Sequence, residues 1–210
     1  MGHLSLFAKE WRMGLRKSLP IGVSAARVVE RIVEVHSEIC EFRILEYNYV
    51  PHALDDPNRI ERWVSASEVR NKGLSSVLKE RAPAEWDIAM YSHVRLRTGT
   101  LRHIPLMDFK SCLDSKQLGN LKGLWADVVG RPGYLLGTDN SYHWYGTELL
   151  THGEWVKFMG RALLCNLDDQ QTVDVRYVGH RLFAGCGSLR LVGNAKRRTK
   201  DPILREIWCN

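Results

Sequence analysis

A serine and a histidine two positions apart follow a short apolar run, and this pairing is suited to binding an anion. The apolar run covers residues 134–136, and Ser141 and His143 come after a polar turn. In an extended segment residues i and i+2 point to the same face, so Ser141 and His143 would contact one phosphate together. The alternative is a hairpin in which the histidine only hydrogen-bonds a backbone carbonyl, because Ser-x-His is a short and common pattern.

Two acidic residues flank this pattern in the sequence, and both are placed where carboxylates are unusual. Asp108 closes the apolar run 104–107, and Asp174 lies between two valines in the stretch 172–176. A carboxylate inside a β-branched strand is costly to bury unless it is paired or binds a metal ion. We therefore expect strands that carry Asp108 and Asp174, one on either side of the Ser-x-His strand in chain order.

These stretches, in this order, resemble the three motifs of the archaeo-eukaryotic primase superfamily, the primase-polymerases. Residues 107–110 are similar to the hydrophobic-Asp-x-Asp motif, residues 141–143 to the small-x-His motif, and residues 173–174 to the hydrophobic-Asp motif. Arg190 and the turn residues that follow it are similar to a later arginine strand of that family. The likeness covers roughly residues 85–200.

The resemblance implies a nucleotidyltransferase of the primase-polymerase type, with a nucleoside triphosphate and DNA or RNA as partners and DNA replication as a plausible process. It implies that the carboxylates of Asp108 and Asp174 hold a divalent cation, Mg²⁺ or Mn²⁺, because hard cations prefer carboxylate oxygens. Ser141, His143 and Arg190 are then expected to contact the phosphates. In such sites the cations bridge phosphate oxygens and stabilise the attacking and leaving groups.

Lys110 stands where the second acid of the first motif is expected, which departs from the family pattern. An ammonium about 4 Å from a divalent cation is repelled by several kcal/mol even at an effective dielectric constant of about 20. We therefore expect at most one cation. Three outcomes stay open: Lys110 replaces a cation and touches phosphate, or it pairs with Asp108 or Asp174, or the site has lost polymerisation and kept binding. An altered or inactive site is favoured over a normal polymerase.

Two other functions compete with this interpretation. Asp108 and Lys110 also fit the Asp-x-Lys half of a metal-dependent nuclease site, for which Asp87 would be the additional acid. The third hypothesis is a non-catalytic nucleic-acid-binding subunit that works with a partner protein.

The composition favours an anionic partner. The net charge is +6, and the pI is about 9.1. Arg95 and Arg97 share one face of an expected strand and would reach a phosphate backbone, as would the basic cluster of Lys196, Arg197 and Arg198. The five cysteines are scattered and lack a CxxC pair, which predicts reduced thiols and a cytoplasmic protein. No apolar run reaches transmembrane length, so we expect neither a membrane partner nor a signal peptide.

The expected fold class is α+β, with an RRM-like antiparallel sheet backed by helices and an N-terminal annex of helices and a strand. Residues 1–84 would form the annex and residues 85–210 the primase-polymerase-like domain. Apolar spacing predicts helices over 4–17, 24–39, 65–81, 111–129 and 154–164. Strands are expected over 40–49 and over 86–96, the latter in a hairpin with the Asp108 strand. The third acidic strand is expected to continue through 176–183 and to pair with 188–192.

Overall fold

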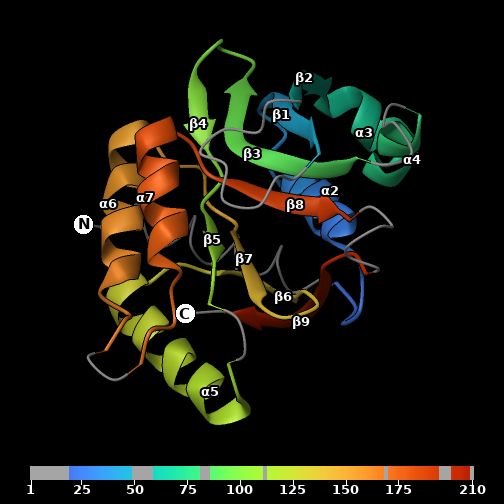
Figure 1. Ribbon diagram of the computed structural model, residues 1–210. Helices are drawn as coiled ribbons and strands as arrows, with labels where there is room; N and C mark the ends of the chain where they lie inside the picture. Colours follow the sequence, from blue (N-terminus) through green and yellow to red (C-terminus); the bar gives the residue numbers. More distant parts are fainter. Residues whose placement is uncertain are drawn as a thin grey trace, which may run out of the picture.

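Two antiparallel sheets and six α-helices make up the described part of this computed structural model (Figure 1). The structure describes residues 19–48, 59–80, 86–110, 113–167, 170–193 and 200–208. The α+β class expected from the sequence is therefore confirmed. The predicted helix over 4–17 lies outside the described residues.

The first sheet has five strands, and it joins strands from the first half of the sequence to β8 (Ser188–Val192). Its order is β2 (Arg59–Ser65), β1 (Ile39–Tyr47), β3 (Asp87–Leu96) and β4 (Leu101–His103), and β8 (Ser188–Val192) also pairs with β3. β8 pairs with the first half of β3 and β4 with its second half, so both occupy one edge of β3. Phe42 and Ile44 of β1 are fully buried, as expected for alternate residues of a half-buried strand.

The second sheet carries the motif residues. Its order is β5 (Leu106–Asp108), β7 (Tyr142–Gly146), β6 (Gly133–Gly137) and β9 (Ile203–Trp208). The predicted hairpin between 86–96 and the Asp108 strand is wrong, because β3 pairs with β4 whereas β5 pairs with β7. Pro105 stands between β4 and β5. Since proline has no N–H to donate, the pairing of β4 with β3 ends before Pro105, and the chain continues as β5 in the other sheet.

The helix that follows β2 is broken in two by a glycine. The structure has α3 (Ala66–Lys72) and α4 (Leu74–Lys79), whereas the sequence predicted one helix over 65–81. Gly73 lies between them at φ 79°, a left-handed conformation that ends an α-helix. The Ser65–Glu68 spacing also gives no capping hydrogen bond from the serine side chain, which contacts Ser67 Oγ at 2.8 Å.

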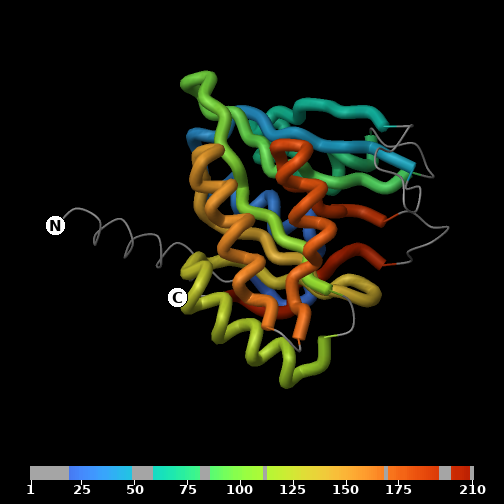
Figure 2. The backbone as a smooth tube through the Cα atoms, turned by 60° about the vertical axis from the view of Figure 1, so that its left-hand side comes forward, coloured from blue at the N-terminus to red at the C-terminus, as the bar shows by residue number. Residues whose placement is uncertain are grey.

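The other helices cover the sheets. α2 (Ala25–Val35) contacts β8 and β9, one strand from each sheet, and Ser24 caps its first turn. α5 (Ser115–Leu124) continues as a π-helical turn through Val129, and its first turn is capped by Asp114 and Gln117. α6 (His152–Leu163) lies beside α7 (Val175–Ala184), as Figures 1 and 2 both show.

The assignment of 176–183 to a strand is wrong, because these residues form helix α7. β8 consequently pairs with β3 and not with that segment. Asp174 is the N-cap residue of α7, and Gly185 ends it at φ 71°. An aspartate before a helix and a glycine after it are the residues that helix ends prefer, so both signals were present in the sequence.

One hydrophobic core joins the two sheets. It contains residues of α2, β1, β3 and the second sheet, and its largest fully buried side chains include Trp125, Trp144 and Trp155. Trp125 packs edge-on against Trp144 with ring centroids 5.0 Å apart. A Cβ atom at Gly133 would lie 2.4 Å from the Trp144 ring, so glycine is required there for close packing.

The expected division into an annex, residues 1–84, and a domain, residues 85–210, stays a prediction. β1 of the expected annex pairs along its length with β3 of the expected domain. No described helix is long and apolar enough to cross a membrane. The described cysteines Cys40, Cys165 and Cys186 are free thiols.

Candidate functional site

The backbone brings the three motif residues Asp108, His143 and Asp174 together. Asp108 of β5 lies directly opposite His143 of β7 in the antiparallel register. On the other side of β5, Phe109 forms an antiparallel bridge with Val173, and the Asp174 N–H donates to the Asp108 carbonyl at 3.2 Å. Residues directly opposite each other in an antiparallel pair share a face, so the Asp108 and His143 side chains emerge together.

His143 faces a carboxylate. Its Nε2 lies 3.7 Å from Asp108 Oδ1, an ion-pair distance when the imidazole is protonated. His143 is 6% exposed, whereas the Asp108 side chain is 30% exposed. The alternative, in which His143 only hydrogen-bonds a backbone carbonyl, therefore does not account for the Asp108 carboxylate beside its ring.

Asp174 has a structural task at the start of α7. Its Oδ1 accepts hydrogen bonds from the backbone N–H groups of Arg176 at 2.8 Å and Tyr177 at 3.2 Å. The expectation that Asp174 lies inside a strand is wrong, because only Val173 before it makes a bridge. Asp174 is also not among the residues that line the cavity described below.

Lys110 extends from the end of β5 toward the loop before Asp174. Its Nζ donates to Gln171 Oε1 at 3.2 Å, and its backbone N–H donates to the Thr172 carbonyl at 2.7 Å. The side chain is exposed. Within the described residues, its side-chain partner is thus an amide and not one of the two aspartates.

A cavity of about 980 Å³ opens between the first sheet, α7 and the Asp108–His143 pair. β1, β2, β3, β5, β7, α7 and β8 all contribute residues to its wall. Its charged lining consists of Arg43, Arg59, Arg181 and Arg190 against Glu61 and Asp108. The wall therefore carries a net positive charge before any histidine is protonated, which favours an anionic ligand.

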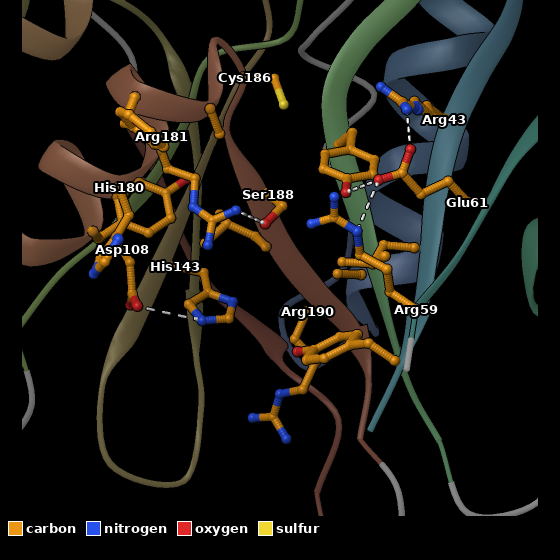
Figure 3. Close-up of a pocket in the computed structure, with 18 of the residues that line it drawn as sticks. Arg43, Arg59, Glu61, Asp108, His143, His180, Arg181, Cys186, Ser188 and Arg190 are labelled. Carbon is orange, nitrogen blue, oxygen red and sulfur yellow. Dashed lines mark hydrogen bonds and ion pairs between the residues drawn. The ribbon is translucent and has the colours of Figure 1, made fainter. Parts of the chain in front are cut away.

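Figure 3 shows how these side chains are distributed. On one side of the pocket lie Asp108, His143, His180 and Arg181; on the opposite side lie Arg43, Arg59 and Glu61; Ser188 and Arg190 come from the strand between them. The Asp108–His143 pair and the Arg43–Glu61 pair therefore stand at different ends of one space.

Arg190 is a buried cation with unsatisfied donors. It is 5% exposed, and its Nε and Nη1 have no hydrogen-bond partner among the described residues. Its backbone carbonyl accepts the Tyr145 hydroxyl at 3.1 Å. Burial raises the pKa of Tyr145 well above its usual range, so this hydroxyl stays protonated and can donate. β8 is thus fixed in place, while two of the three guanidinium nitrogens of Arg190 lack acceptors among the described residues.

The opposite end of the cavity has a satisfied charge network. Glu61 pairs with Arg43 and, at 3.5 Å, with Arg59, and it accepts the Tyr91 hydroxyl at 2.8 Å. The Arg43 guanidinium also lies over the Tyr91 ring, 4.8 Å from its centroid. Burial and the nearby Glu61 raise the pKa of Tyr91 above its ordinary value.

α7 contributes residues that the sequence analysis did not propose. Arg181 Nη1 donates to Ser188 Oγ at 2.8 Å, which holds its guanidinium at the cavity wall. His180 and Phe183, close to Arg181 on α7, line the same cavity. These residues were missed because the segment 176–183 was assigned to a strand; the Asp cap and the closing glycine were the signals that indicate a helix.

Several predicted site residues lie elsewhere. Ser141 belongs to the turn before β7, where its hydroxyl contacts Thr138 Oγ1 at 2.9 Å, and it does not line the cavity. Arg95 pairs with Glu41 at 2.6 Å, and Arg97 donates to the Ser37 carbonyl at 3.1 Å. The basic cluster Lys196, Arg197 and Arg198 lies outside the described residues.

The expectation of a divalent cation at Asp108 and Asp174 stays a prediction. The described residues contain no group of three or more histidine, cysteine, aspartate or glutamate side chains that could hold a metal ion. Asp108 and Asp174 are adjacent through their backbones, and Mg²⁺ is often bound by one or two carboxylates together with water and substrate phosphates. Lys110 stands at the position where the resemblance implies a second acid.

The fold and site define an α+β protein with an arginine-lined cavity beside a row of three motif residues. The family described as "AEP-like: Archaeo-eukaryotic primase 1D-like" matches residues 65–203. The match spans more than half of the chain and includes Asp108, His143 and Asp174. The chain therefore belongs to this archaeo-eukaryotic primase family, as a divergent member that lacks the second acid of the first motif.

Among solved structures, the chain is similar to the polymerase domain of Mycobacterium tuberculosis Ligase D in complex with DNA. The identity is 12%, the TM-score is 0.43, and the similarity covers 87% of this chain and 80% of that chain. No curated protein matches the chain.

Proposed function

We propose that this protein binds the phosphate groups of a nucleotide or of a nucleic-acid strand in the arginine-lined cavity. One observation carries the proposal: Arg190 is 5% exposed, and its Nε and Nη1 lack partners within the described residues. A buried cation without hydrogen bonds is costly. Phosphate oxygens fit the planar guanidinium fork and would satisfy both nitrogens.

Other residues support the same ligand. His143 lies at the Asp108 end of the cavity, and Arg181 is oriented by Ser188. Both would add donors to a phosphate held by Arg190. Lys110 does not line the cavity and would contribute only a positive charge next to Asp108 in the sequence, and Ser141 would act indirectly by fixing the turn that leads into His143.

We further propose that Asp108 and Asp174 hold at most one Mg²⁺ or Mn²⁺ ion. Such an ion would neutralise charge on the bound phosphates. Asp174 would share its carboxylate between the ion and the N-terminus of α7, so the affinity for the ion is expected to be modest. Cation-free binding through the arginines is the competing outcome of the test below.

The RRM-like arrangement expected from the resemblance is part of the proposal. The order β5–α5–β6–β7–α6 followed by the Val173 bridge is a βαββαβ succession, with the last strand reduced to one bridge. Val173 and β7 flank β5 on its two sides. This order supports the placing of the three motifs on neighbouring segments.

The chemistry that we propose is binding with weak or absent nucleotidyl transfer. Transfer of a nucleotidyl group needs cations that stabilise the negative charge on the attacking and leaving oxygens, and two metal ions usually supply them. The lysine at the acid position removes one of these ions. No observation favours the nuclease hypothesis, because Asp87 opens β3 in the other sheet and does not line the cavity.

The test is calorimetric titration of the full chain with a nucleoside triphosphate and with tripolyphosphate, in Mg²⁺ and in a chelator. Arg190→Met removes the guanidinium at nearly constant volume, and Arg161→Met on the exposed surface of α6 is the matched control. Hydrogen bonds to charged groups contribute about 1.5–3 kcal/mol, so Arg190→Met should lower the affinity for both ligands about 10- to 100-fold. Equal affinities of Arg190→Met and the wild type would overturn the proposal.

A second measurement separates the catalytic alternatives. A labelled DNA primer-template is incubated with Mg²⁺ or Mn²⁺, with and without all four nucleoside triphosphates. Binding without change in length is the expected result. Extension would show that polymerisation survives Lys110, and shortening without nucleotides would favour the nuclease.

A further inference from the structure

Phe183 stands at the edge of the cavity with its side chain in solvent. It is 96% exposed, the highest value among the large hydrophobic side chains of the described residues, and it nevertheless lines the cavity. Gly179, His180 and Ala184, three of the other α7 residues that line the cavity, lie on the same face of the helix as Phe183. A fully exposed aromatic ring therefore borders a space lined by four arginines.

The helix surface next to this ring is bare. A residue in a helix leans over the turn before it, so Phe183 leans toward Gly179, four positions earlier. A Cβ atom at Gly179 would meet nothing within 4 Å, so packing does not require a glycine there. Glycine within a helix lowers its stability relative to alanine. The flat surface that Gly179 leaves beside the ring is open to a planar ligand.

We infer that Phe183 is a stacking platform for an unpaired base of a single nucleic-acid strand whose phosphates enter the cavity. The inference rests on the proposed function and names the ligand class. Proteins that bind single strands combine cationic grooves for the backbone with aromatic rings for the bases. Here the arginines of the cavity and Phe183 supply these two parts within one wall.

The position of the ring favours a strand over a mononucleotide. The cavity of about 980 Å³ is large enough for a nucleotide. The ring lies at its solvent edge and not in its interior, as its exposure shows. A strand with one phosphate at Arg190 would continue outward across α7 and bring a base to Phe183. Stacking on a ring face uses no base-edge hydrogen bonds, so little sequence preference is expected.

The experiment compares two ligands that differ only in their bases. Fluorescence anisotropy measures the affinity of the full chain for a labelled single-stranded oligonucleotide and for an abasic sugar-phosphate oligomer of the same length. The variants are Phe183→Ala, Phe183→Trp and, as the phosphate-site control, Arg190→Met. Gly179→Leu is a further variant that covers the bare surface beside the ring.

The wild type should bind the oligonucleotide about 5- to 100-fold more tightly than the abasic oligomer. Phe183→Ala should bind the two ligands equally, with an unchanged affinity for the abasic oligomer. Phe183→Trp should keep the preference for the oligonucleotide. Gly179→Leu should reduce the preference for the oligonucleotide. Arg190→Met should weaken the binding of both ligands by a similar factor.

The inference is overturned if Phe183→Ala leaves both affinities unchanged, or weakens both by the same factor. In the first case the phosphate site stands if Arg190→Met still weakens both ligands, and the exposed ring would then serve another partner. If the wild type binds neither oligomer nor tripolyphosphate, the proposed function fails together with the stacking platform.

Discussion

At Arg190 the protein keeps a buried positive charge in a position where an apolar side chain of similar volume would fit. Its neighbours in β8, Leu189 and Leu191, are both buried in the hydrophobic core. Residues that are costly to the fold and face a cavity are candidates for function, because stability and activity place opposite demands on such a site.

Arg190→Met is therefore expected to stabilise the protein while it removes phosphate binding. Removal of the buried charge should raise the free energy of unfolding by about 1–3 kcal/mol, since the desolvation cost disappears. Urea titration monitored by tryptophan fluorescence measures this change. A lower free energy of unfolding for Arg190→Met would show that Arg190 stabilises the fold, which would contradict this expectation.

His103 makes the fold sensitive to acid. It is 2% exposed, its Nδ1 lies 2.9 Å from Ser92 Oγ, and its ring stacks on Trp155. Burial, followed by the nearby His93 and His152, lowers the pKa of His103 to about 3. The ordinary value is about 6.5. Between these values the unfolded chain takes up a proton that the native chain does not.

The stability from His103 is therefore complete above about pH 6.5 and is lost as the pH falls toward 3. At pH 4.5 the loss is expected to be on the order of 2–3 kcal/mol. Urea titrations at pH 7.5 and pH 4.5 measure it, with His103→Phe as the variant that cannot titrate. An equal decrease in both proteins would show that His103 is not responsible.

Among the elements, α7 connects the motif row to the cavity. Its N-cap is Asp174, and its cavity face carries His180, Arg181 and Phe183. Any loss of the cap would move side chains that the proposed function requires. The carboxylate of Asp174 therefore has two separable roles, one in the helix and one proposed for the cation.

Two substitutions separate these roles. Asp174→Ala should lower the free energy of unfolding by about 1 kcal/mol because the cap is lost, whereas Asp174→Ser should retain most of it. Both variants should lose any Mg²⁺ dependence of nucleotide binding. The cation role is refuted if Mg²⁺ dependence survives in the serine variant, and the capping role is refuted if alanine and serine are equally stable.

The sequence predicted the elements whose patterns are local. β1, β3, β5, β6 and β8 lie where alternating or apolar runs indicated strands, and α6 where an aromatic stripe indicated a helix. α7 was missed because Val173 and Val175 around Asp174 have high β propensity, which outweighed the cap signals at its two ends. β2 and β9 were not predicted. β9 pairs with β6, a strand distant in the sequence, and tertiary pairing decides such segments, whereas β2 pairs with the preceding strand β1.

On the scale of the whole molecule, the cavity is a product of long-range assembly. Its walls combine β1 and β2 near the start of the chain with α7 and β8 near its end. The sequence therefore did not indicate that Arg43, Arg59 and Arg181 line one cavity, since no motif contains them. Asp108, His143 and Arg190 were identified because the family resemblance supplied the pairing that the sequence alone lacks.

The charge of this wall predicts a salt-dependent affinity for single strands. If about three phosphates are neutralised, the slope of log K against log salt concentration should be about −2, and Arg190→Met should reduce its magnitude by about 0.7. Anisotropy titrations between low and moderate salt give this slope. A slope near zero would contradict a phosphate-binding cavity.

The proposed phosphate site predicts where the phosphates of a bound nucleotide lie. A crystal structure of the chain with a bound nucleoside triphosphate measures this. Phosphate oxygens are expected within about 3 Å of Arg190 Nε or Nη1, at the His143 end of the cavity. Phosphates bound outside the cavity, with the Arg190 guanidinium still lacking acceptors, would contradict the account.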